Sequence, residues 1–138
     1  MAPQPKDAEL AQSLRLVRLL NASRKQQGPL AQIEPLDEAA WQMVLEMQKT
    51  SYQEESPFTT GMAPSDYLKK AGFKVQQTPV DVRPRKKQGT FQSPDGLLRH
   101  VVKESLEDQA FSLAAHDKAY TLCGAACRNG NFVLILAG

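Results

Sequence analysis

The Asn129-Gly130 pair near the C-terminus is the feature that most constrains how this chain folds. An Asn-Gly step between two strand-like runs is typical of a two-residue hairpin, because a type I′ turn needs positive φ at both central residues. The flanking residues 120–128 and 131–136 are therefore predicted to pair as antiparallel strands. Since residues 132–136 are apolar without alternation, we expect helices to cover the last strand on both faces.

Two amphipathic helices are predicted in the N-terminal half. In residues 7–27, apolar side chains recur at every third or fourth position, the period of one helix face, at Leu10, Leu14, Val17 and Leu20. Asp7 is the expected N-cap of this helix, and Gly28-Pro29 is its expected stop. A second helix is expected to open at Asp37 and to run through Met47.

The remaining elements complete the order helix, helix, helix, strand, helix, strand, strand. Residues 64–71 predict a short third helix closed by Gly72, and residues 73–82 predict a short or edge strand, since Pro79 interrupts it. Ser93-Pro94-Asp95 predicts the start of a fourth helix, because it supplies an N-cap, a first-turn proline and an acid. This order indicates an α/β (α+β) fold, a three-layer α-β-α sandwich with a C-terminal β-hairpin.

Length and charge narrow the function classes. With 138 residues, we expect one domain over residues 7–138 after a short lead-in over residues 1–6. Lys and Arg total 17 against 15 Asp and Glu, so nucleic acid is not the expected partner of the surface as a whole. No apolar run approaches the roughly 20 residues that cross a bilayer, so no transmembrane segment is predicted.

Four separated stretches, at residues 20–30, 61–73, 93–95 and 123–126, carry short motifs in one order along the chain. Together they resemble the CAP superfamily of cysteine-rich secretory, antigen 5 and pathogenesis-related proteins, with the bacterial SCP-like branch as the closer match. Asn21, Arg24, Gly28 and Leu30 resemble the Asn-x-x-Arg, Gly, Leu opening of that family. Ala71-Gly72-Phe73 is similar to the family's alanine-glycine-aromatic step, and Ser93-Pro94-Asp95 is similar to the start of its next helix. The segment around Cys123-Gly124 resembles its final strands, so the resemblance covers residues from about 14 to 138.

This resemblance implies a CAP-like sandwich without the metal centre that some members carry. Those members hold a divalent ion with two histidines and acidic residues in a central cleft. Here the first histidine position falls near Ser56, the second near Asp108, and the glutamate position near Val80 or Asp81. Because neither histidine is present, we expect no metal and no cofactor.

The leading interpretation is a non-enzymatic CAP-like domain that binds a protein, glycan or lipid ligand. The resemblance implies a secreted or periplasmic location, although residues 1–6 have neither the apolar stretch nor the cleavage site of a secretory signal. A CAP-like fold that lacks the metal-binding histidines favours a binding function over catalysis.

A hydrolase-like activity is the alternative from another class. Glu104 and Asp108 are four residues apart on the predicted fourth helix, and paired carboxylates of this kind shift each other's pKa and serve as acid and base. They would act with Ser56 or a nearby histidine around the cleft. The simpler interpretation makes them two solvated surface acids, with His100 and His116 as surface or capping residues.

A basic run offers a third alternative, an anion-binding loop for nucleic acid or an anionic glycan. Its members are Arg83, Arg85, Lys86 and Lys87. The run has no interleaved aromatic residue on which a base would stack, and Pro84 lies within it, so we favour a solvated connecting loop.

The two cysteines test the strand assignment. Cys123 and Cys127 are four residues apart, which in a strand separates their Cα atoms by roughly 13 Å, too far for a disulfide. Alternation places both on one face of the sheet. We therefore expect two buried, unbridged thiols.

Overall fold

The computed structural model describes residues 4–24, 28–49, 64–73, 80–86, 94–128 and 130–138. Its helices are α1 (Asp7–Ala22), α2 (Glu34–Lys49), α3 (Pro64–Lys70), α4 (Pro94–Glu107) and α5 (Gln109–Ala115). Its strands are β1 (Ala31–Gln32), β2 (Val80–Lys86), β3 (Leu122–Arg128) and β4 (Asn131–Ala137). They form one sheet in the order β1-β3-β4-β2, in which only the β1 and β3 pair is parallel.

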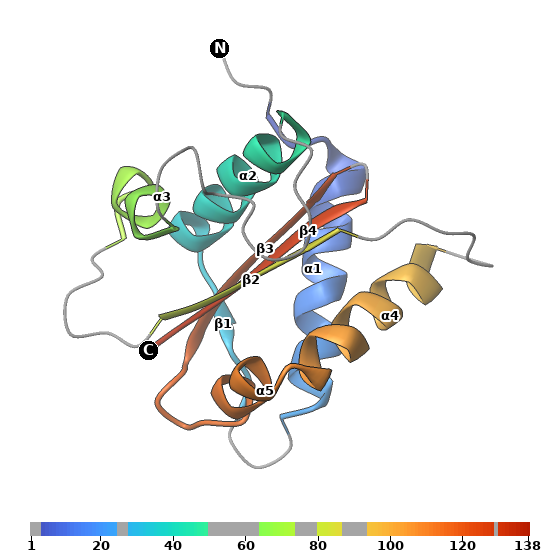
Figure 1. The fold of residues 1–138 in the computed structure, drawn as a ribbon, viewed down its shortest axis with the longest axis vertical. Helices are drawn as coiled ribbons and strands as arrows, with labels where there is room; N and C mark the ends of the chain where they lie inside the picture. The colour runs from blue at the N-terminus through green and yellow to red at the C-terminus, as the bar shows by residue number, and fades with distance from the viewer. Residues whose placement is uncertain (1–3, 25–27, 50–63, 74–79, 87–93, 129) are drawn as a thin grey trace.

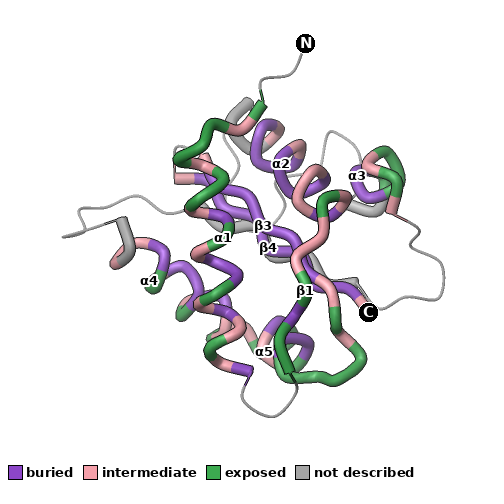
Figure 2. Tube along the Cα trace, turned by 180° about the vertical axis from the view of Figure 1, so that it is seen from behind, coloured by how far each residue is buried: buried purple, intermediate pink, exposed green. Residues whose placement is uncertain are grey.

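The sheet lies between two helical layers, which confirms the predicted three-layer α-β-α sandwich. Helices α1, α4 and α5 pack on one face, and α2 and α3 pack on the other (Figure 1). Strand β4 is buried along its whole length (Figure 2). Phe132 and Leu134 contribute to the core under α1, α4 and α5, whereas Val133 and Ile135 contribute to the core under α2 and α3. The apolar run without alternation is therefore explained by two cores that share one strand.

The C-terminal hairpin is confirmed. Arg128 pairs with Asn131, so two residues form the turn, and Gly130 has a φ of 81°. This positive φ is what a type I′ turn requires at its second central position. Asn129 lies outside the described residues, so the turn type itself stays a prediction.

Several element boundaries differ from the sequence prediction. Helix α1 ends at Ala22 and does not reach residue 27. The N–H groups of Ser23 and Arg24 donate to carbonyls three residues back, those of Leu20 (3.1 Å) and Asn21 (3.0 Å), so the last turn tightens as the chain leaves the helix. Helix α2 begins at Glu34, three residues before Asp37. The third helix ends at Lys70, one residue earlier than expected, and Gly72 follows it with a φ of 91°. The fourth helix is confirmed over Pro94–Glu107, whereas its expected cap Ser93 lies outside the described residues.

Two elements were not predicted, and one strand lies further along the chain. Strand β1 has only two residues and helix α5 only seven, too short to give a clear periodicity. The strand expected within residues 73–82 runs over Val80–Lys86. The described helices include none that is long and apolar enough to span a membrane.

Asn21 and Arg24, which open the family-like motif, connect the end of α1 to distant backbone. The Asn21 amide donates to the Leu30 carbonyl (3.2 Å) and accepts from the Leu30 N–H (2.8 Å). Arg24 is 4% exposed and donates to three carbonyls, those of Gly28 (2.9 Å), Ala115 (2.7 Å) and Tyr120 (2.9 Å). One guanidinium therefore ties the end of α1 to the connection between α5 and β3.

Replacing Arg24 by Ala is expected to lower the free energy of unfolding by about 3 kcal/mol, because partly buried carbonyls lose a charged donor. Urea unfolding followed by circular dichroism measures the change. Arg18→Ala is the control, since Arg18 is exposed on the same helix, and it should change stability by less than about 0.5 kcal/mol. Equal losses in the two variants would contradict the role assigned to Arg24.

Cys123 and Cys127 are free, buried and on the α1 side of the sheet, as the alternation predicts. The Cys127 thiol lies 3.0 Å from the Gln12 side-chain oxygen on α1. Burial raises the pKa of each thiol to about 12. Almost no thiolate, the reactive form, is therefore present near neutral pH.

Titration with an aromatic disulfide reagent at pH 8 is expected to count two thiols in denaturant and almost none over minutes in the folded chain. The physical reason is the combination of a raised pKa with packing under α1. Rapid modification of the folded chain, or a Cys123 to Cys127 disulfide found by mass spectrometry, would contradict the buried-strand assignment.

Candidate functional site

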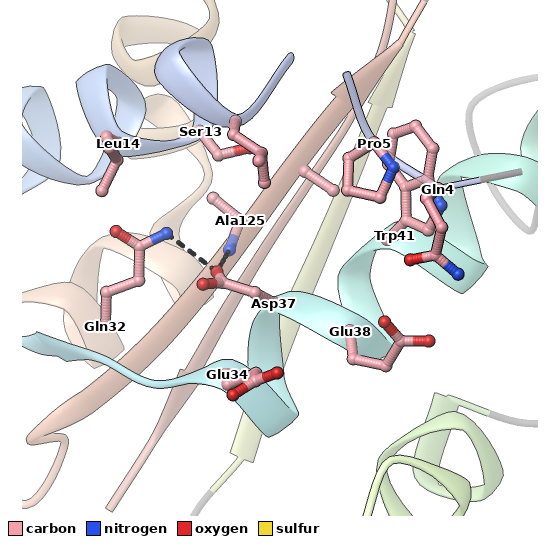
Figure 3. A pocket seen from close by; sticks show the side chains of 12 residues that line it. Gln4, Pro5, Ser13, Leu14, Gln32, Glu34, Asp37, Glu38, Trp41 and Ala125 are labelled. Atoms are coloured by element: carbon pink, nitrogen blue, oxygen red, sulfur yellow. Dashed lines mark hydrogen bonds between the residues drawn. The ribbon is translucent and has the colours of Figure 1, made fainter. Parts of the chain in front are cut away.

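A cleft of about 380 Å³ lies where α1, the start of α2 and the β1 edge of the sheet meet (Figure 3). The chain before α1 contributes to one side of it. The residues that line the cleft are Gln4, Pro5, Leu10, Ser13, Leu14, Gln32, Glu34, Asp37, Glu38, Trp41, Ala125 and Ala126.

The cleft exists because β1 stops after two residues. The last backbone bond of this parallel pair runs from the Ile33 N–H to the Cys123 carbonyl (3.1 Å). The chain then turns into α2, and the next N–H along this edge, that of Ala125, donates to Oδ1 of Asp37 (2.9 Å). The same oxygen accepts from the Gln32 side chain (2.9 Å). A side-chain oxygen thus stands where a longer β1 would place a carbonyl.

Gly124 permits the close approach that makes this bond possible. A Cβ atom at this position would lie 2.3 Å from the Leu36 carbonyl carbon and 2.6 Å from the Asp37 nitrogen. Any larger residue would therefore push the first turn of α2 away from β3. The absence of a side chain at Gly124 places Asp37 against the strand edge.

Asp37 is a partly buried carboxylate whose pKa is raised above its ordinary value. Burial is the largest cause, since it disfavours the charged form. The hydrogen bonds from Gln32 and Ala125 oppose the increase, and the nearby charge of Glu34 adds to it. The fold therefore keeps the Asp37 carboxylate at a position where burial disfavours its negative charge.

The described lining of the cleft is acidic and apolar. It has three carboxylates, those of Glu34, Asp37 and Glu38, and none of its lining residues is Lys, Arg or His. Glu38 accepts a hydrogen bond from Gln42 (3.0 Å). Asp37 lies between Leu14 on α1 and Trp41 on α2 (Figure 3). An acidic floor between apolar walls is suited to an amphipathic ligand.

The apolar walls differ in how much surface they offer. Leu10 and Leu14 are 46% and 52% exposed, one turn apart on α1. Trp41 is only 3% exposed, and the Arg128 guanidinium lies 5.7 Å from its ring centre. Arg128 also lies 3.7 Å from Glu9. The two leucines therefore provide accessible apolar surface, whereas the Trp41 side chain is almost entirely covered.

The acids predicted from the sequence lie elsewhere. Glu104 pairs with His100 on α4. Asp108 follows the last residue of α4, so the expectation that both acids share one helix is wrong. Its carboxylate instead caps α5 by accepting from the Phe111 N–H (2.9 Å). Neither acid is among the residues that line the cleft. Ser56 lies outside the described residues, and a catalytic role for these three residues stays a prediction.

The basic run is part of the sheet. Arg83, Arg85 and Lys86 belong to β2, where residues 80–86 pair with β4 throughout, so the expected connecting loop is wrong over these residues. Pro84 is tolerated because β2 is an edge strand. Lys87 lies outside the described residues. Anion binding by the run stays a prediction.

The positions that the resemblance assigns to the family's metal ligands belong to different elements of the fold. Asp108 caps α5, Val80 and Asp81 start β2, and Ser56 lies outside the described residues. The described ranges hold no group of three or more His, Cys, Asp or Glu that could bind a metal ion.

Two bacterial proteins are among the solved structures that share this fold. An extracellular protein containing an SCP domain from Bacillus anthracis str. Ames matches with a TM-score of 0.70 and 15% identity over 99% of this chain. A cysteine-rich secretory protein from Staphylococcus aureus subsp. aureus Mu50 matches with a TM-score of 0.64 and 16% identity, again over 99% of this chain. The chain spans 44% and 41% of the length of those proteins.

The chain therefore has the CAP fold of bacterial SCP domains, as its motifs implied. No family model and no curated protein matches its sequence.

Asp37→Asn is expected to keep both hydrogen bonds, because its amide oxygen accepts where the carboxylate oxygen does. Asp37→Ala leaves the buried Ala125 N–H without this acceptor, so it should lower the free energy of unfolding by about 2 kcal/mol more than Asp37→Asn. Urea unfolding of the three proteins tests this order. Equal stability of the two variants would contradict the role of Asp37 at the strand edge.

The pH dependence of stability gives a second readout of the same residue. Because folding raises the pKa of Asp37, the folded chain binds this proton to higher pH than the unfolded chain. The free energy of unfolding attributable to Asp37 therefore falls as pH rises from the ordinary pKa of 3.8 through the raised value. Asp37→Asn should lack this decline.

Proposed function

We propose that this chain is a non-enzymatic binding domain that acts outside the cytoplasm and takes a protein, glycan or lipid ligand in the cleft between α1 and α2. The accessible apolar surface inside the cleft carries this proposal. Leu10 and Leu14 expose about half of their surface at a concave site. A ligand that buries this apolar surface stabilises the complex.

Binding is favoured over hydrolysis by the chemistry of the described lining. Ser13 is the one hydroxyl-bearing residue among the lining residues, and its Oγ donates to the Glu9 carbonyl (3.0 Å) within α1. It is 7% exposed, and no histidine is among the lining residues. The described part of the cleft thus offers acids but no nucleophile beside a base.

The location outside the cytoplasm is supported by the two structural neighbours, of which one is an extracellular protein and the other a secretory protein. Because this chain spans less than half of each neighbour, their whole activities are not carried over. The proposal concerns the cleft of this chain alone.

Leu14→Glu is expected to weaken binding of an uncharged, environment-sensitive apolar dye by about tenfold, because it removes accessible apolar surface and adds a charge at the cleft wall. Fluorescence titration measures the affinity. Leu113→Glu is the matched control, since Leu113 is 66% exposed on α5 and is not a lining residue. Equal affinity of both variants, or the absence of dye binding to the unmodified chain, would overturn the proposal.

A further inference from the structure

One oxygen of the Asp37 carboxylate supports the edge of the sheet. Oδ1 accepts both the Gln32 and the Ala125 hydrogen bonds. Among the described residues, none donates a hydrogen bond to Oδ2. Asp37 lines the cleft, with its side chain lying between the two walls (Figure 3). A charged acceptor therefore remains available to a ligand at a partly buried position.

The charges around Asp37 are complementary to a cation. Glu34 lies one turn before it and Glu38 follows it, and no basic residue is among the described lining residues. Like charges so close together repel, and the repulsion from Glu34 is one cause of the raised pKa of Asp37. A positive group from a ligand would relieve this repulsion and would form a charge-assisted hydrogen bond with Oδ2.

The lining of the cleft disfavours a neutral glycan and an anionic lipid. A fatty acid or an anionic lipid headgroup would bring a further negative charge towards three carboxylates. A neutral glycan commonly uses an exposed aromatic face, yet Trp41 is 3% exposed and covered on one side by Arg128. A polypeptide segment can present a cation and apolar side chains together.

We infer that the occupant of the cleft is a basic segment of a partner protein, which places one Lys or Arg side chain at Asp37 and apolar neighbours on Leu10 and Leu14. This inference rests on the proposed function and names its partner class. The cleft volume of about 380 Å³ is at the lower end of the range for ligand sites, so it accommodates a few side chains rather than a large ligand.

The test uses three capped pentapeptides of the form Gly-Leu-X-Leu-Gly, in which X is Lys, Gln or Glu, titrated into the full chain by calorimetry. The Lys peptide is expected to bind about tenfold more tightly than the Gln peptide, and the Glu peptide should bind most weakly. Added salt should reduce this preference, since the contact is electrostatic.

Charge-removing variants locate the contact. Asp37→Asn and Glu34→Gln are each expected to weaken the Lys peptide several-fold more than the Gln peptide. Glu107→Gln is the matched control, because it removes one negative charge from an exposed position at the end of α4 that is not a lining residue. Glu34 is itself exposed, so its variant keeps the test valid if Asp37→Asn folds poorly.

Three outcomes would overturn the inference. They are equal affinities of the three peptides, equal effects of Glu107→Gln and Glu34→Gln, and tighter binding of dodecanoate or of a neutral oligosaccharide than of the Lys peptide. In each case, dye binding that still depends on Leu14 would leave the proposed function standing. Loss of dye binding as well would overturn both.

Discussion

One hydrogen bond, from the Ala125 N–H to Oδ1 of Asp37, lets the sheet end at a two-residue strand. A buried backbone donor without an acceptor would cost about 1–3 kcal/mol, so the edge of β3 needs an oxygen beyond the last residue of β1. Helix α2 supplies that oxygen from its first turn, and Gly124 lets the turn approach closely enough. The start of α2, the edge of the sheet and the opening of the cleft all depend on this contact.

The contact also determines the electrostatics of the cleft. A neutral amide at position 37 would satisfy the strand edge as well, yet the chain carries a carboxylate there, half-buried and close to Glu34. The fold thus tolerates a desolvated charge that its own packing does not require. A partly buried charge that the packing does not need is typical of functional sites, where a ligand supplies the partner for that charge. This is the physical basis for assigning a cationic partner.

Much of the fold was predictable because local chemistry and long-range packing agree. The Asn129-Gly130 turn, the apolar strand that follows it and the periodicities of the longer helices each predict the element that the structure contains. The sequence prediction missed two short elements that depend on their neighbours. Strand β1 exists through its pairing with β3, and α5 is stabilised by the Asp108 cap and by burial of Phe111. The Asn-x-x-Arg motif was visible, but its three distant carbonyl partners were not.

The sequence alone determined the layers of this protein, because alternation, helix period and turn residues act over a few neighbouring positions. It also contained the CAP-like motifs in order, and it showed two cysteines too far apart along a strand to pair. The tertiary structure alone decided the site. Asp37 looked like the first residue of a helix, and its partner Ala125 is 88 positions away. Hydrogen bonds over such a distance leave no periodic signal, so only the folded chain shows which carboxylate faces the cleft and which, like Asp108, caps a helix.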